Sequence, residues 1–194
     1  PISSAARMLM FEANARLLIA EFPSIPDGYE SLYAVARDSE PTVAKRILSD
    51  LLASQAPDSL KAQSALALHR LRLIGENIRA IFTELKLELP TSLKESVGAA
   101  LIYTWSDSDS SSLKKVKQTA EYLQIKNLIG IRMTIPELGV IAASPSEIPG
   151  SQIVVQPAQH VALLNRLGLG SAGLVLVLDA DGFITKVNPK PTRP

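Results

Sequence analysis

Hydrophobic and polar positions follow two different patterns, which meet near residue 75 of the chain. Before that point apolar residues recur every three or four positions, the spacing of a helix that buries one face. Beyond it the apolar residues form short runs or alternate with polar ones, which is typical of strands. The first pattern predicts helices over residues 2–22, 38–55 and 59–74, and the stretch PSIPDGY, with two prolines and a glycine, is expected to break the first of them. We therefore expect a helical domain (residues 1–75), an α/β domain (76–190) and a short tail (191–194).

The second pattern predicts a definite order of elements. The stretch IRAIFTELKLELP alternates and is rich in strand formers, so it predicts two short strands over residues 78–90. The nearly continuous apolar run SVGAALIYTW predicts a central strand covered on both faces. Downstream we expect the following elements: a helix after the polar loop with Leu113, Val116, Ala120 and Leu123 on one face, a buried strand over 127–133, a short strand over 151–156, a short helix over 157–169 and a β-hairpin over 174–188 with its turn at Asp181–Gly182.

Composition excludes several classes of partner. The chain has 46% hydrophobic and 20% charged residues and a formal net charge of +1. The sequence contains no block of like charge, and only 5% of its residues are aromatic, so no nucleic-acid partner is expected. No apolar run is long enough for a membrane-spanning helix, so no integral membrane segment is expected in this chain. No signal peptide is recognisable, and a mature or trimmed chain would have lost one.

Cysteine is absent from the sequence. This excludes disulfides, thiolate nucleophiles and cysteine-based metal sites. The two histidines, His69 and His160, cannot form a zinc site without carboxylates, and each is expected to be a satisfied structural residue. We expect no cofactor and no bound metal.

Several stretches of the second half together resemble the thioredoxin-like fold, in particular the TlpA/ResA type of envelope thiol–disulfide oxidoreductases. The resemblance covers roughly residues 73–189 and is carried by the order and spacing of LIGENIRAIFTEL, LPTSLKESVGAALIYTWS and LLNRLGLGSAGLVLVLDADGFITKVN. It implies a three-layer α/β domain, here preceded by helices, in a bacterial protein of the periplasm or cell envelope. The final helix usual in the family has no counterpart after Asn188, as expected of a truncated or shortened member.

The resemblance fails where that family performs its chemistry. The two cysteine positions that follow the family's tryptophan, here Trp105, fall on Asp109 and Ser112, with Ser110 and Ser111 between them. The family's cis-proline falls on Gly173. Thiol–disulfide exchange requires a thiolate, so the resemblance implies a redox-inactive member without catalytic residues.

Three hypotheses account for the loop SDSDSSS after Trp105. Asp107, Asp109 and the serines can cap the following helix, because their oxygens accept its free N–H groups and the carboxylates meet its positive dipole end. Alternatively, the loop is a former active site that still binds a partner. A third interpretation is a phosphotransferase of the haloacid-dehalogenase type, with Asp107 as nucleophile and Asp109 as acid/base. That reaction also requires a lysine, further acidic Mg²⁺ ligands and more parallel strands, for which the chain has no room.

These patterns favour a non-catalytic protein with a binding or scaffold role and a protein partner. The binding residues would be those of the degenerate loop and its surroundings: Trp105, Asp107, Asp109, Ser110, Ser111, Ser112 and Gly173. An alternative is a structural or assembly subunit that docks through its helical half. This alternative predicts an exposed apolar patch on the N-terminal helices.

Overall fold

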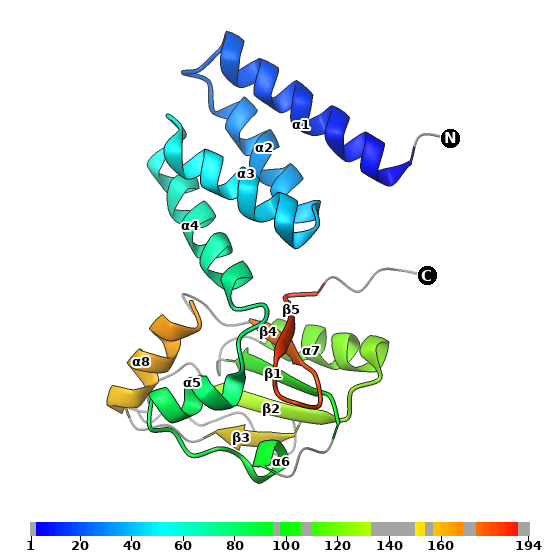
Figure 1. Ribbon diagram of the computed structural model, residues 1–194, viewed down its shortest axis with the longest axis vertical. Coiled ribbons are helices and arrows are strands. Elements are labelled where there is room, and N and C mark those ends of the chain that lie inside the picture. Colours follow the sequence, from blue (N-terminus) through cyan, green and yellow to red (C-terminus); the bar gives the residue numbers. More distant parts are fainter. Residues whose placement is uncertain are drawn as a thin grey trace. The chain divides into compact units, whose positions relative to one another are not determined.

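The computed structural model describes residues 3–94, 98–105, 110–132, 150–153, 157–168 and 174–189 (Figure 1). The chain divides into two compact units, residues 1–71 and residues 72–194. Each unit has its own hydrophobic core. Among the helices of the described ranges, none combines the length and the hydropathy needed to cross a membrane.

The first unit is built from helices. They are α1 (Ser4–Glu21), α2 (Pro26–Asp38), α3 (Pro41–Ala53) and α4 (Asp58–Arg72), the last ending at the boundary between the units. Three of them were predicted, whereas α2 begins in the proline- and glycine-containing stretch that was expected only to break the first helix. Proline is well tolerated at the first position of a helix, where its missing N–H would be unpaired in any case. Pro26 and Pro41 both occupy this starting position.

The core of the first unit is an apolar cluster between helices. In α3, Ile47, Leu48 and Leu51 are fully or almost fully buried. They pack with Tyr29 and Leu32 of α2, which are also buried. In α1, by contrast, Glu12 and Ala15 are the buried residues. The helix is therefore held to the unit by a narrow strip of its surface.

An ion-pair network links α1 to α3. The carboxylate of Glu12 accepts from Arg16 Nε at 2.9 Å through one oxygen and from Arg46 at 2.8 Å through the other. Arg16 also pairs with Asp50 at 2.6 Å. Glu12 is only 8% exposed, and a buried charge is costly unless it is paired. Two guanidinium groups, which remain partly in water, compensate the charge of its carboxylate. The hydrogen bond from Arg46, helped by Arg16, lowers the pKa of Glu12 below its ordinary value of 4.5.

Replacing Glu12 with glutamine is expected to lower the free energy of unfolding of the helical unit by about 1–2 kcal/mol at neutral pH, because two charge-assisted hydrogen bonds are weakened. Since the pKa is depressed in the folded state, this contribution is present above pH 4.5 and is lost as the pH falls through the folded value. The difference between wild type and variant should therefore disappear in acid. Urea unfolding followed by far-ultraviolet circular dichroism at pH 7 and in acid measures it.

The exposed glutamate Glu30 of α2 provides the matched control, and Glu30→Gln should leave stability unchanged at both pH values. Emission from Trp105, the only tryptophan, reports on the second unit and should show an unchanged transition. A Glu12→Gln variant that is equally destabilised at both pH values would show that packing, and not charge, accounts for the loss.

The second unit contains a five-stranded mixed sheet in the order β3-β2-β1-β4-β5. The strands are β1 (Ala100–Trp105), β2 (Asn127–Arg132), β3 (Ser151–Ile153), β4 (Val175–Leu178) and β5 (Ile184–Val187). β1 and β2 are parallel neighbours, with Ala100 opposite Asn127 and Trp105 opposite Arg132, and both lie where the sequence predicted strands. β4 runs antiparallel to β1 and forms a hairpin with β5.

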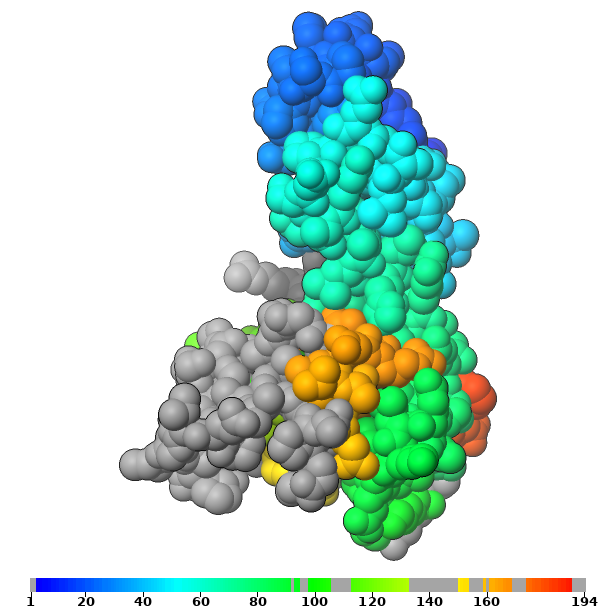
Figure 2. Space-filling model, turned by 90° about the vertical axis from the view of Figure 1, so that its left-hand side faces the viewer, coloured from blue at the N-terminus to red at the C-terminus, as the bar shows by residue number. Residues whose placement is uncertain are grey.

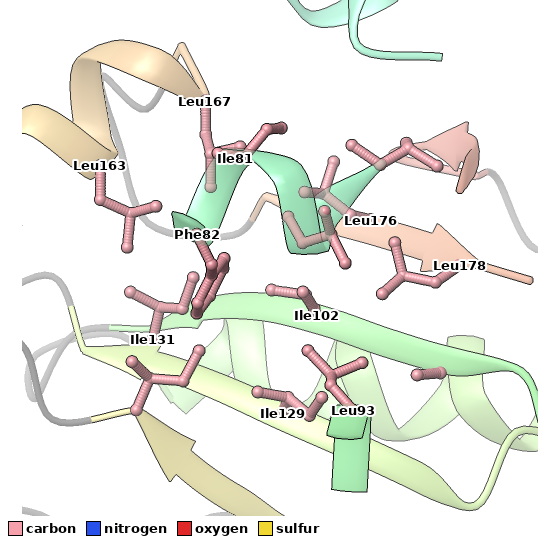
Figure 3. Close-up of a cluster of buried hydrophobic side chains, with 14 of the residues drawn as sticks. Ile81, Phe82, Leu93, Ile102, Ile129, Ile131, Leu163, Leu167, Leu176 and Leu178 are labelled. Carbon is pink, nitrogen blue, oxygen red and sulfur yellow. The ribbon is translucent and has the colours of Figure 1, made fainter. Parts of the chain in front are cut away.

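Helices cover both faces of this sheet, which gives the three-layer α/β fold that the sequence predicted. Helices α5 (Ile78–Glu84) and α8 (Pro157–Arg166) lie on one face, where Phe82 and Leu163 pack against Ile102 and Ile131 of the strands (Figure 3). Helix α7 (Ser110–Leu123) lies on the other face. The alternation of side chains along β1 makes this possible: one set of residues points to α5 and α8, and the residues between them point to α7.

The prediction of two strands over residues 78–90 is wrong. This stretch forms helix α5, and a short helix α6 (Thr91–Lys94) follows it. The Asn77 side chain accepts from the N–H of Arg79 and caps α5. Ile78, Ile81 and Phe82 are fully buried, at the three- and four-residue spacing of one helix face.

Polar contacts join helix α8 to α5 and to the residues that flank α5. Figure 2 shows α8 (orange) against the green segment that contains α5. Arg166 pairs with Glu76 at 2.6 Å and with Glu84 at 3.3 Å. The predicted hairpin turn is also present, and the Asp179 carboxylate accepts from the N–H groups of Asp181 and Phe183. Asp179 therefore stabilises the turn.

Candidate functional site at the ends of the central strands

The candidate site lies where β1 and β2 end. Because the two strands are parallel and in register, their last residues, Trp105 and Arg132, are direct neighbours at one edge of the sheet. Ligands of α/β proteins commonly bind at the carboxyl ends of such strands, near the start of the next helix. Here that helix is α7, which begins at Ser110.

Trp105 is held in place by side chains from β2 and from β3, the strand beyond it. Its indole N–H donates to Oε1 of Gln152 in β3 at 2.9 Å, and the ring is 3% exposed. The amide of Gln152 also donates to the hydroxyl of Tyr103 at 3.3 Å. The guanidinium carbon of Arg132 lies 5.6 Å from the centroid of the indole ring, a distance at which a cation–π attraction operates.

A glycine in the middle of β2 makes room for this network. Gly130 lies between Tyr103 of β1 and Gln152 of β3 in the register of the sheet. A Cβ at Gly130 would meet both amide atoms of Gln152 and would lie 2.8 Å from the Tyr103 hydroxyl. The glutamine side chain therefore crosses over the bare backbone of Gly130 to reach the two aromatic residues.

The chemical character of these groups favours binding over proton transfer. Burial raises the pKa of Tyr103 above its ordinary value of 10.0, so its hydroxyl is neutral at physiological pH. Indole and amide groups do not titrate, and arginine keeps its charge in proteins. The four side chains thus combine two buried aromatic rings, neutral hydrogen-bonding groups and one fixed positive charge.

The structure describes part of the predicted binding set. Trp105 ends β1, as predicted, and Ser110, Ser111 and Ser112 form the first turn of α7, where their backbone is described but their side chains are not. The remaining predicted positions, Asp107, Asp109 and Gly173, lie outside the described residues. The capping and partner-binding roles predicted for this loop therefore stay predictions.

The segment that follows Gly173 is tied directly to β1. The N–H of Leu174 donates to the hydroxyl of Thr104 at 2.9 Å, and the N–H of Thr104 donates to the carbonyl of Leu174, also at 2.9 Å. Thr104 is buried, and this reciprocal pair satisfies its hydroxyl. The chain on the carboxyl side of Gly173 is therefore fixed beside the end of β1.

Four residues of the site were not singled out by the sequence: Tyr103, Gly130, Arg132 and Gln152. One signal pointed to Gly130, because an isolated glycine within an apolar strand often marks a close approach by another group. Gln152 had no such signal, since its role depends on the pairing of β3 with β2. Within the described ranges, no group of three or more histidine and acidic residues is arranged to hold a metal ion.

Comparison with known proteins finds a likeness to a solved structure. No protein-family model and no curated protein matches the chain. A solved structure, a thioredoxin-like protein from Bacteroides caccae, is similar with a TM-score of 0.49 and 9% sequence identity, over 95% of this chain and 74% of that one. The strand order and the layers described above define the three-layer α/β fold independently of this likeness.

Proposed function

We propose that this protein is a redox-inactive, thioredoxin-like protein of the TlpA/ResA type that binds a protein partner outside the cytoplasm. It acts as a binding or scaffold module and performs no catalysis. The observation that carries this proposal is the state of the site: the chain has no cysteine, while the tryptophan at the end of β1 is held by three neighbouring side chains.

The chemistry of this edge supports binding. Without a thiolate the protein cannot exchange disulfides, and the described groups at the edge offer no acid or base that titrates near neutral pH. Arginine is among the residues that contribute most to affinity at protein-binding surfaces. The proposed contact surface combines Arg132 with the loop that holds Asp107 and Asp109, and the buried Trp105 supports it from below. The extracytoplasmic location is proposed from the family resemblance.

Affinity capture from the envelope fraction of the native host tests the proposal. Asp107→Ala/Asp109→Ala is expected to reduce recovery of the partner about tenfold relative to wild type, as loss of a charged interface contact typically does. Glu30→Ala/Glu121→Ala is the matched control, since it removes the same charge from exposed helix positions. Equal recovery by all three proteins would contradict binding at the loop. A magnesium-dependent phosphatase activity that Asp107→Asn abolishes would contradict the non-catalytic part.

A second candidate function is docking through the helical unit, as expected of a structural or assembly subunit. One observation favours it, because α1 carries several exposed large apolar side chains, among them Leu9, Phe11 and Leu17. The capture experiment distinguishes the two functions. A partner that the loop variant retains and that a Phe11→Ser/Leu17→Ser variant loses would assign docking to α1.

A further inference from the structure

Helix α1 exposes a large apolar surface. Met10 is 55% exposed, Phe11 58%, Leu17 59% and Leu18 43%. The opposite side of the helix is packed, since Ala15 is buried and a Cβ at Gly28 of α2 would lie 2.9 Å from the Ile19 side chain. Contiguous apolar surface of this kind marks interaction sites in soluble proteins.

The exposed residues of α1 are arranged symmetrically about Asn14. Residues three and four positions away on either side of a helical residue lie within about 60° of its direction, and residues seven away within about 20°. The residues three positions away are Phe11 and Leu17, and those four positions away are Met10 and Leu18. Seven positions away are Arg7 on one side and Glu21 on the other. One face of α1 therefore carries a polar centre, an apolar pair on each side, and opposite charges at its two ends.

We propose that this face of α1 binds the same face of a second copy of the chain, with the two helices antiparallel and a two-fold axis passing beside Asn14. In this arrangement the apolar pair Met10 and Phe11 of each copy packs against the pair Leu17 and Leu18 of the other. Arg7 of each copy faces Glu21 of the other at both ends of the helix pair. A two-fold interface of this kind uses one self-complementary patch twice.

Charge complementarity selects this occupant and this orientation. Arg7 and Glu21 are exposed, and among the ion pairs formed by the described residues neither takes part. In a parallel pair Arg7 would face Arg7, whereas the antiparallel pair joins opposite charges and opposes the two helix dipoles favourably. The two Asn14 amides can donate to and accept from each other. A single asparagine within an apolar helix interface fixes its register.

The first test is a charge exchange measured by sedimentation equilibrium on the full chain. Wild type is expected to be dimeric, and Arg7→Glu or Glu21→Arg alone should weaken association about tenfold, because each places two like-charged pairs in the interface. The double variant Arg7→Glu/Glu21→Arg should restore it. Mixing the two single variants should also restore it, since every opposed pair then has opposite charges. A monomeric wild type, or a double variant as weak as the singles, would overturn the proposal.

The second test uses the absence of native cysteine, which makes any introduced thiol unique. Asn14→Cys should form an intermolecular disulfide readily, because the two copies of this position meet at the axis. Arg7→Cys should not, because its two copies would be separated by fourteen residues, about 21 Å along the helix. Ala13→Cys, exposed but off the face, is the matched control. Efficient cross-linking through Arg7→Cys would show a parallel pair, and no cross-linking through Asn14→Cys would exclude contact at this face.

Discussion

Replacing Phe82 with alanine is expected to lower the free energy of unfolding of the α/β unit by about 3–5 kcal/mol, the usual cost of removing a large aromatic side chain from a packed core. The Phe82 side chain is fully buried between α5 and the sheet, near Ile102 and Ile131 (Figure 3). Its removal forfeits the transfer energy of the ring and leaves a cavity that the strands can fill only partly. Urea unfolding followed through the emission of Trp105 measures the effect.

Two neighbouring substitutions make this experiment a test of the helical conformation of α5. Ile81 is also buried, at 1% exposure, so Ile81→Ala should cost about 2–4 kcal/mol. Thr83 is exposed, and Thr83→Ala should change stability by no more than about 0.5 kcal/mol. Consecutive residues of a strand point to opposite faces of the sheet, whereas in α5 both contribute to one core. A neutral Ile81→Ala beside a costly Phe82→Ala would therefore contradict the helix.

The central part of the α/β unit was predictable because its elements are buried on every side. β1 is buried along its whole length, and a strand covered on both faces must be apolar at every position. The hairpin was predictable for a different reason. Its turn depends on local chemistry, with Gly182 at a φ of +87° and Asp179 accepting two backbone hydrogen bonds.

The helices α2 and α5 show where local patterns mislead. The prolines and glycine before Tyr29 were interpreted as a break, but proline also starts helices, and Gly28 is required for the close approach of α1. In α5 the alternation of apolar and polar letters matched a strand, although Ile78, Ile81 and Phe82 equally match a helix face. A seven-residue segment is too short for periodicity to decide, and packing on the sheet determines its conformation.

The surroundings of Trp105 could be predicted only in part. Trp105 was identified because it ends a recognisable strand just before a polar loop. The residues that hold it belong to other strands, and their proximity follows from the sheet order. Gln152 lies forty-seven residues from Trp105 in the chain, so no local pattern could associate the two. Long-range register, which composition does not encode, brings them together.

Replacing Gly130 with alanine is expected to destabilise the α/β unit by about 1–3 kcal/mol, although alanine alone favours a strand slightly over glycine. The added methyl group would occupy the space through which Gln152 reaches Tyr103 and Trp105. Gln152 is exposed enough to swing into solvent, which would leave the buried indole N–H without its acceptor. Because Trp105 is the only tryptophan, its emission should shift in the folded variant, and unfolding in urea gives the change in stability.

A double-mutant cycle with Gln152→Ala separates this displacement from any other effect of the methyl group. Gln152→Ala alone removes the same two hydrogen bonds, so Gly130→Ala should cost at least about 1 kcal/mol less in that background than in wild type. Additive costs would contradict the proposed mechanism and would place the conflict at the Tyr103 hydroxyl, 2.8 Å from the new atom. If the costs of the two substitutions are coupled, the role of Gly130 is to leave space above β2. Through that space Gln152, two strands away from Trp105, reaches the indole ring and holds it at the end of β1.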